Sequence, residues 1–153
     1  MPARKLKEFL DKEKIKYVSI MHSTAYTAQE VAASAHITGK ELAKTVIVEL
    51  DGKMAMAVLP ANKKIVRQDL REVTGCDEVK FASEEEFSNK FPECETGAMP
   101  PFGNLYGMDV YVAESLTNND EIAFNAGSHT EVVRMKFSDF ERLVRPKVIS
   151  FTT

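Results

Sequence analysis

The sequence predicts an α+β fold, or mixed α/β fold, with one central mixed and mostly antiparallel sheet that helices cover. Three observations predict it. An Asp51-Gly52 turn joins two apolar segments, 46–50 and 54–59, which is typical of a β-hairpin. Both segments are apolar on both faces, so they belong in the middle of a covered sheet. The remaining elements mix hairpins with isolated helices, which favours a mixed sheet.

The size and composition are those of one ordinary globular domain. The chain has 153 residues, 44% hydrophobic and 28% charged, and we expect a single domain over residues 1–153. A net charge of −3 argues against nucleic-acid binding through a general basic field, but it leaves room for a local basic patch. No apolar run is long enough to cross a membrane, and the N-terminus has no apolar signal core, so we expect a cytoplasmic protein.

The N-terminal elements follow from apolar spacing and from capping signals. Apolar residues on one face predict a helix over 3–14, and residues 15–20 read as a short strand. A Ser or Thr followed three residues later by Glu forms a capping box, which starts a helix. The sequence has three such pairs: Thr27 with Glu30, Ser83 with Glu86, and Ser138 with Glu141.

The C-terminal elements follow the hairpin. A helix over 65–73 is expected to end at Gly75, where a left-handed residue closes it. The segment 97–107 is dense in Gly and Pro and predicts a loop. The remaining predicted elements are strands at 79–82, 108–113, 121–125 and 131–135, a helix at 138–144 and a tail strand near Val148.

Lys44 opens an apolar segment on its buried face. Side chains alternate along a strand, so Lys44 shares a face with Val46, Val48 and Leu50. One interpretation is a lysine at a strand end, with its stem on apolar surface and its ammonium in water. The other is a partly desolvated ammonium facing a cleft, where it binds a phosphate or carboxylate or polarises an ester carbonyl.

The loop at 97–107 is a second candidate site. It begins Gly97, Ala98, Met99, Pro100 and Pro101 and carries little charge. Ordinary loops also contain Gly and Pro. The functional interpretation is a rigid loop that points backbone N–H and C=O groups at a small ligand, which suits an amino group and a carbonyl.

A polar turn that includes Asn125, Ser128 and His129 follows the strand predicted at 121–125. A simple turn between strands explains most of that composition. The functional interpretation places these residues at a pocket mouth as hydrogen-bond donors. Ser128 and His129 do not form a nucleophile–base pair, because neighbours on a strand point to opposite faces.

The basic segment 62–67 also has two interpretations. It is either a solvated helix start or a small patch that contacts phosphates near the cleft. Cys76 and Cys94 form no metal-binding motif, and the three histidines are scattered. We therefore expect no metal and no cofactor.

Four segments occur in the order seen in one protein family. They are HSTAYTAQE at 22–30, AKTVIV at 43–48, GAMPP at 97–101 and FNAGSHTE at 124–131. Together they resemble the YbaK/ProX-like aminoacyl-tRNA deacylases, which are related to the editing insertion of bacterial prolyl-tRNA synthetases. The resemblance runs from about residue 20 to about residue 145.

The resemblance implies a freestanding trans-editing enzyme that hydrolyses the ester between a wrong amino acid and the terminal adenosine of a tRNA. It implies Lys44 as the essential lysine, Gly97 and Pro101 as the ends of a Gly-x-x-x-Pro loop, and His129 as a pocket histidine. We expect water to be the nucleophile, because no protein base is evident. The expected aminoacyl group is small (Ala, Ser, Thr or Cys), and larger ones are excluded by a steric sieve. The expected substrate contacts come from Gly97, Ala98, Met99, Pro100, Pro101, Asn125, Ser128 and His129.

Two other functions compete with this one. A non-catalytic module that senses aminoacyl-tRNA or an amino-acid-like ligand would bind without turnover. A generic ester hydrolase is disfavoured, because the sequence has no Gly-x-Ser-x-Gly motif and no Cys/His pair. The modest basic charge favours weak or local tRNA contacts, with a synthetase or an elongation factor as a possible delivering partner. We expect a monomer by default.

Overall fold

The predicted hairpin lies at the centre of the sheet in the computed structural model, which describes residues 4–153. Its strands are β2 (Leu42–Leu50) and β3 (Lys53–Pro60). Asp51 and Gly52 form the turn with φ of 51° and 85°. Positive φ at both turn positions matches the right-handed twist of the two strands, which explains the Asp-Gly pair.

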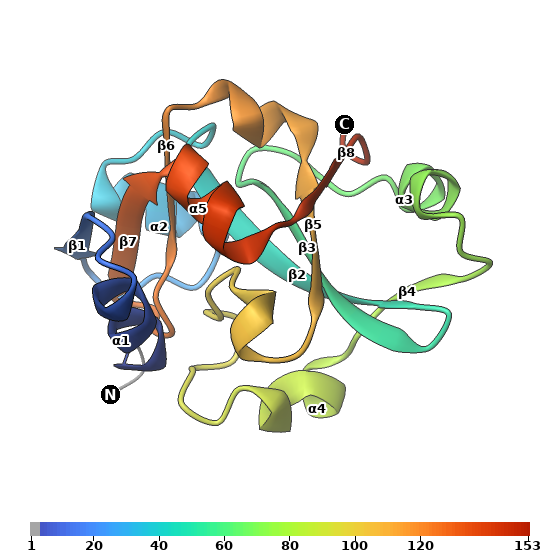
Figure 1. Cartoon of the computed structure of the whole chain (residues 1–153), viewed down its shortest axis with the longest axis horizontal. Coiled ribbons are helices and arrows are strands. Elements are labelled where there is room, and N and C mark those ends of the chain that lie inside the picture. Colours follow the sequence, from blue (N-terminus) through green and yellow to red (C-terminus); the bar gives the residue numbers. More distant parts are fainter. Residues whose placement is uncertain (1–3) are drawn as a thin grey trace.

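Eight strands form one mixed sheet in the order β1-β7-β6-β2-β3-β5-β8, with β4 also paired to β2 (Figure 1). Four of the seven pairings are antiparallel, while β2–β6, β3–β5 and β5–β8 are parallel. The prediction of a mixed and mostly antiparallel sheet is therefore confirmed. The other strands are β1 (Tyr17–Met21), β4 (Val79–Phe81), β5 (Asp109–Ala113), β6 (Glu121–Asn125), β7 (Glu131–Lys136) and β8 (Lys147–Ile149).

Five α-helices are present in residues 4–153: α1 (Arg4–Lys12), α2 (Ala28–Ala35), α3 (Arg67–Thr74), α4 (Glu84–Phe87) and α5 (Phe137–Val144). The start predicted for the first helix, Ala3, lies outside the described residues. The third helix begins two residues later than predicted, because Ile65 instead bridges to Thr152. Gly75 ends it in the left-handed conformation, as predicted.

Two of the three predicted capping boxes are formed. The Thr27 and Ser83 side chains each accept a hydrogen bond from the backbone N–H of the Glu three residues later, and that Glu bonds back. The box at Ser138 was wrong. Helix α5 already begins at Phe137, whose N–H donates to the Asp120 carbonyl at 2.9 Å. The helix therefore begins one residue before the predicted cap, after a tertiary hydrogen bond, and Ser138 lies inside its first turn.

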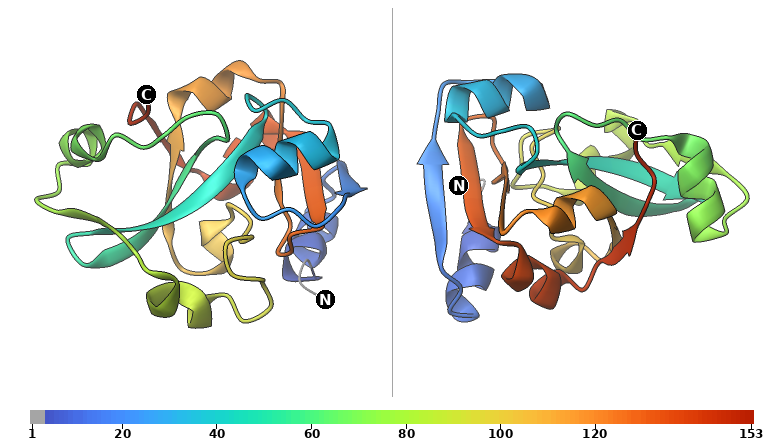
Figure 2. Two further views of the ribbon diagram at one scale, coloured as in Figure 1. Left: turned by 180° about the vertical axis from the view of Figure 1, so that it is seen from behind. Right: turned by 90° about the horizontal axis from the view of Figure 1, so that it is seen from above.

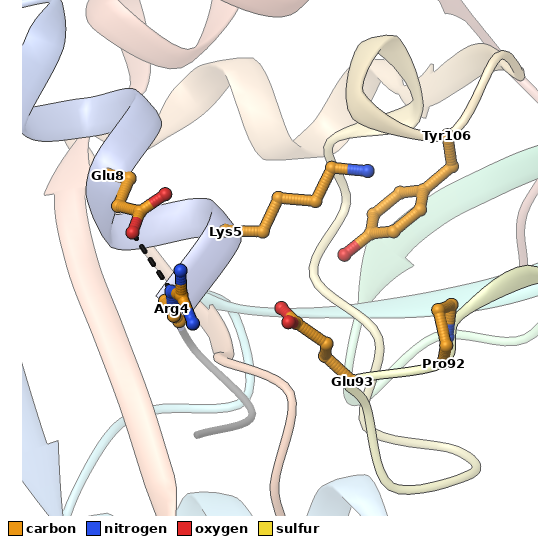
Figure 3. Close-up of a pocket in the computed structure, with 6 residues that line it drawn as sticks. All are labelled: Arg4, Lys5, Glu8, Pro92, Glu93 and Tyr106. Atoms are coloured by element: carbon orange, nitrogen blue, oxygen red, sulfur yellow. Dashed lines mark hydrogen bonds and ion pairs between the residues drawn. The ribbon is translucent and has the colours of Figure 1, made fainter.

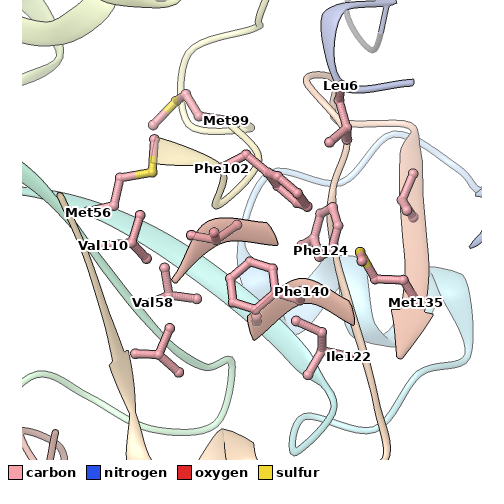
Figure 4. Packing of buried hydrophobic residues seen from close by; sticks show 14 of the residues in the cluster. Leu6, Met56, Val58, Met99, Phe102, Val110, Ile122, Phe124, Met135 and Phe140 are labelled. Atoms are coloured by element: carbon pink, nitrogen blue, oxygen red, sulfur yellow. The ribbon is translucent and has the colours of Figure 1, made fainter. Parts of the chain in front are cut away.

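The largest core cluster fills one face of the sheet, beneath α1 and α5. Its centre is aromatic: the Phe102 ring lies 5.4 Å from that of Phe124 and 5.5 Å from that of Phe140 (Figure 4). On the opposite face, α2 packs with one cluster and α3 with another (Figure 2). Helices thus cover both faces, as the two-sided apolar pattern of the hairpin predicts.

Helices that would be long and hydrophobic enough to cross a bilayer do not occur in the described part of the chain.

Candidate functional site

Lys44 lies on β2 between two hydrophobic clusters, one that packs with α2 and one that packs with α3, on the face of the sheet opposite α1 and α5. On the same side of the strand, Leu42 belongs to the cluster under α2 and Val48 to the cluster under α3. Lys44 and Val46 fall between them and are only partly buried. The lysine therefore interrupts an apolar face at the place where neither helix covers the sheet.

The pairing of strands leaves a gap at the same place. Strand β6 pairs only with the first two residues of β2, and β4 pairs with β2 only from Val48 onward. Both strands lie on the same edge of β2, because β3 occupies the other edge. The segment 44–47 consequently has no partner strand on that edge within the described chain.

Backbone groups of Thr45 point into this gap. Groups directed at the edge belong to alternate residues: the Glu41 carbonyl accepts from Ala123 N–H at 2.9 Å, and the Ile47 carbonyl accepts from Ala82 N–H at 3.0 Å. Thr45 lies midway in that alternation, so its N–H and C=O face the gap. Neither group has a partner strand within residues 4–153, so one residue offers both a donor and an acceptor to a small polar ligand.

The gap is the floor of a hollow of about 180 Å³. Its walls come from four parts of the chain that are distant in sequence. The lining residues are Tyr26, Ala28, Ala43, Lys44, Thr45, Val46, Gly97, Met99 and Asn125. The structure thus brings together Lys44, part of the Gly/Pro loop and Asn125, which the sequence analysis singled out separately.

The Lys44 ammonium is partly desolvated. Its Nζ donates to the Ala61 carbonyl at 3.5 Å, and no carboxylate of residues 4–153 forms an ion pair with it. Burial lowers the pKa of Lys44 from its ordinary value, and the nearby Lys64 charge lowers it further. The structure holds an uncompensated cation at the hollow.

The Gly/Pro loop is a rigid wall. Residues 98–103 are buried, and the Ala98 carbonyl accepts from Gly127 N–H at 2.8 Å. Gly97 adopts φ 90°, a left-handed conformation that favours glycine, and its N–H donates to the Met99 Sδ at 3.3 Å. Of the predicted loop contacts, Gly97 and Met99 line the hollow, while Ala98, Pro100 and Pro101 pack behind them.

The polar turn contributes Asn125 directly. Its Oδ1 is buried and has no hydrogen-bond partner in the described structure, so the amide is available to a ligand. Ser128 and His129 serve the turn itself. The Ser128 hydroxyl lies 3.3 Å from the Thr130 hydroxyl, and neither Ser128 nor His129 is among the lining residues. Their predicted contact with substrate stays a prediction.

His129 braces the two loops. Its N–H donates to the Glu95 carboxylate at 2.7 Å, and its Nε2 lies 3.1 Å from the Thr96 carbonyl. Its ring lies 4.8 Å from the ring of Tyr26, which is 70% exposed at the mouth of the hollow. Sequence reasoning did not single out Tyr26 or Thr45 for the site. Two local signals could have pointed to Tyr26: its position directly before the helix cap at Thr27, and its place in the segment 22–30 that carries the family resemblance.

A second hollow, of about 310 Å³, lies between α1 and the segment that carries Pro92 and Glu93 (Figure 3). Its two cations already have partners. Arg4 Nε pairs with Glu8 at 3.0 Å, and Lys5 Nζ donates to the Leu105 carbonyl at 2.8 Å. With its cations satisfied internally, this hollow has less to offer a ligand than the one at Lys44.

Known proteins with similar sequences include one named for prolyl-tRNA editing and one named for tRNA deacylation. The chain is 25% identical over 142 residues to the prolyl-tRNA editing protein ProX of Acetoanaerobium sticklandii, covering 89% of this chain and 86% of that protein. It is 30% identical over 115 residues to the multifunctional Ser/Thr-tRNA deacylase ProXp-y of Escherichia coli strain K12, covering 71% and 68%.

Solved structures share the fold. A candidate trans-editing enzyme for prolyl tRNA synthetase superposes with a TM-score of 0.84 at 18% identity, covering 99% of this chain and 97% of that one. A protein described only as hypothetical superposes with a TM-score of 0.86 at 18% identity, covering 97% and 99%. At this identity the likeness establishes the fold alone.

The model of the aminoacyl-tRNA editing domain family matches residues 22–143. This range contains all the residues that line the hollow at Lys44. The match covers most of the chain, and the predicted resemblance is thereby confirmed: the chain belongs to the aminoacyl-tRNA editing domain family.

Proposed function

We propose that this protein is a trans-editing hydrolase that deacylates mischarged aminoacyl-tRNA carrying a small amino acid. The observation that carries the proposal is the hollow at the interrupted edge of β2. Within residues 4–153, Lys44 has no ion-pair partner there, Thr45 has no partner strand on that edge and the Asn125 Oδ1 has no hydrogen-bond partner. The names of the sequence relatives and the family membership support the same reaction.

The groups in the hollow match the parts of an aminoacyl ester. Such an ester has a cationic α-amino group, a carbonyl and a ribose that continues into a phosphate chain. In our proposal the Thr45 carbonyl and the Asn125 amide oxygen accept hydrogen bonds from the α-ammonium group. The Lys44 ammonium faces the ester carbonyl and the ribose, where it stabilises the negative charge that develops on the carbonyl oxygen.

Water is the proposed nucleophile. None of the lining residues is Asp, Glu or His, so we assign no protein general base. Water adds to the ester carbonyl carbon and gives one proton to a neighbouring hydroxyl of the substrate, which passes its own proton to the ester oxygen of the ribose. The ester C–O bond then breaks, and the ribose oxygen leaves with a proton, which releases the amino acid and the tRNA. Aminoacyl esters are activated, so positioning and charge stabilisation suffice.

The size of the hollow supports a small aminoacyl group. Pockets for drug-sized ligands are about 300–1,000 Å³, whereas this hollow is about 180 Å³. Its Gly97 and Met99 wall is fixed by buried loop packing, so it does not widen cheaply. We infer that Ala, Ser, Thr and Cys esters are accepted and that larger side chains are excluded by contact.

We also propose that residues 1–153 act as a single domain and as a cytoplasmic monomer. Synthetases and elongation factors are candidate partners that would bring the charged tRNA to it.

The test is hydrolysis of tRNAs charged with Ala, Ser, Thr, Cys and Pro by wild type, by Lys44→Met and by Lys12→Met. Lys12 is an exposed lysine at the end of α1 and serves as the matched control. We expect turnover of one or more small esters, a loss of about 100-fold or more in kcat/KM for Lys44→Met, and wild-type rates for Lys12→Met.

A stability control and two contrary outcomes make the result decisive. Thermal unfolding of Lys44→Met must equal or exceed that of wild type, because the substitution removes a partly desolvated charge. Near-normal turnover by a folded Lys44→Met would refute the role of the lysine. Binding of aminoacyl-tRNA by wild type without hydrolysis of any ester would favour the non-catalytic sensing module instead.

A further inference from the structure

Phe81 is an exposed aromatic residue on the face of the sheet that carries the hollow. It is 45% exposed, and the Arg67 guanidinium lies 4.9 Å from the centre of its ring. Phe81 pairs with Val48 across β4 and β2, and paired residues share a face. Lys44 and Val46 precede Val48 on that face, so the Phe81 ring stands on the same side of the sheet as the Lys44 ammonium.

Unpaired cations connect the hollow to this ring. Lys64 lies near enough to Lys44 to disfavour its charged form, and Arg67 begins the helix that follows. Neither Lys64 nor Arg67 forms an ion pair with a carboxylate of residues 4–153. Lys44 and Lys64 repel each other, and Arg67 follows Lys64 by three residues and lies over the Phe81 ring, so an anionic ligand that contacts these cations is favoured.

The position of the Lys64 segment is fixed. The Lys64 N–H donates to the Thr153 Oγ1 at 3.3 Å, and the Lys64 carbonyl accepts from the Thr153 N–H at 3.0 Å. The Val66 N–H donates to the Phe151 carbonyl at 2.8 Å. The backbone that carries the cations is therefore held before a ligand arrives, which lowers the entropy cost of binding.

We propose that Phe81 and Arg67 form a stacking platform for an unstacked base in the single-stranded end of the tRNA, upstream of the esterified nucleotide. Lys64 and Arg67 contact the phosphates between that base and the hollow. The inference rests on the proposed deacylase function and adds a second binding site for the same substrate. An exposed aromatic ring beside cations is the pattern with which proteins bind single-stranded nucleic acid without reading its sequence.

Spacing along the strand fits this path. Lys44 and Val48 are four residues apart on β2, which corresponds to about 13 Å at about 3.3 Å per residue. A short single strand covers that distance. Arg67 itself also lines a hollow of about 490 Å³ together with Asp77 and Glu78, whose carboxylates disfavour phosphates there. The favourable path for phosphates therefore runs between the platform and the site at Lys44, and it ends there.

The experiment compares two substrates and three variants. The substrates are aminoacyl-tRNA and the corresponding aminoacyl-adenosine, which has the ester but none of the upstream nucleotides. The variants are Phe81→Ala, Phe81→Tyr, which keeps the ring, and Val73→Ala, which truncates an apolar residue of similar exposure (47%) on α3. We expect Phe81→Ala to lower kcat/KM for aminoacyl-tRNA about tenfold or more and to leave aminoacyl-adenosine unchanged. Phe81→Tyr and Val73→Ala should match wild type on both substrates.

A second measurement separates this inference from the proposed function. Fluorescence anisotropy of a labelled RNA oligonucleotide ending in CCA reports binding with no ester present. Weaker binding by Phe81→Ala supports the platform even if wild type hydrolyses nothing. Equal losses on both substrates, or unchanged hydrolysis and binding in Phe81→Ala, would overturn the platform and leave the deacylase assignment standing.

Discussion

Replacement of Gly103 by alanine should destabilise the protein strongly. An added Cβ would lie 2.4 Å from the Met108 carbonyl oxygen and 2.6 Å from the Val110 Cγ2. Both distances are far below normal contact, and one partner is a backbone atom that cannot rotate away. Gly103 and Val110 are buried, so the loop or β5 must shift. Overpacking of this kind costs about 3 kcal/mol, which for a chain of this size lowers Tm by about 6–12 °C.

The assay is thermal unfolding of Gly103→Ala beside Gly107→Ala. At Gly107 nothing lies within 4 Å of an added Cβ, and the cost comes only from its φ of +68°, about 1–2 kcal/mol. Gly103→Ala should therefore unfold at the lower temperature. The double variant Gly103→Ala/Val110→Ala should lose less stability than the sum of the two single losses, because Val110→Ala removes one of the two close contacts. A Gly103→Ala variant as stable as Gly107→Ala would show that the loop is not packed in this way.

Two further predictions concern charge and capping. Lys64→Gln should raise the lowered pKa of Lys44, because it removes a nearby positive charge. The fall in kcat/KM at alkaline pH, which follows loss of the Lys44 ammonium proton, should then move to higher pH. The pH profile of aminoacyl-adenosine hydrolysis, corrected for the spontaneous rate, measures this shift, and an unshifted profile would contradict the coupling between the two lysines. Ser83→Ala should cost about 1 kcal/mol in urea unfolding, whereas Ser138→Ala, which removes no cap, should stay within about 0.5 kcal/mol; equal losses would contradict the difference in capping.

Local sequence patterns predicted most helices and strands. They also showed that Lys44 is a charged residue on an otherwise apolar strand face. The hairpin depends on neighbours in sequence, so its turn and its two-sided burial could be inferred from residues 46–59. A lysine out of place in that pattern was visible for the same reason. The helix start at Ser138 failed because Asp120, distant in sequence, supplies a hydrogen bond to Phe137. Capping rules consider only the residues beside the cap.

The shape of the site could not be inferred in the same way. The gap beside Thr45 exists because β6 pairs with the start of β2 and β4 pairs with its end. The register of each pairing depends on packing between residues distant in sequence. The roles of Tyr26 and of the Thr45 backbone follow from that gap. Residue type contains no signal for a backbone group left free by its neighbours, whereas Asn125 could be singled out because its side chain is polar.

The way β2 is shared among three strands has a consequence for the order of folding. The β2–β3 hairpin closes through a short turn, but β2–β6 and β1–β7 join segments far apart in the chain, which costs more loop entropy. We expect the hairpin to form early and the β6 pairing late. Because Asn125 ends β6, the hollow would be completed only when the sheet is nearly whole. A nascent or partly folded chain would then display Lys44 without its walls, so selective hydrolysis would begin only with the finished fold.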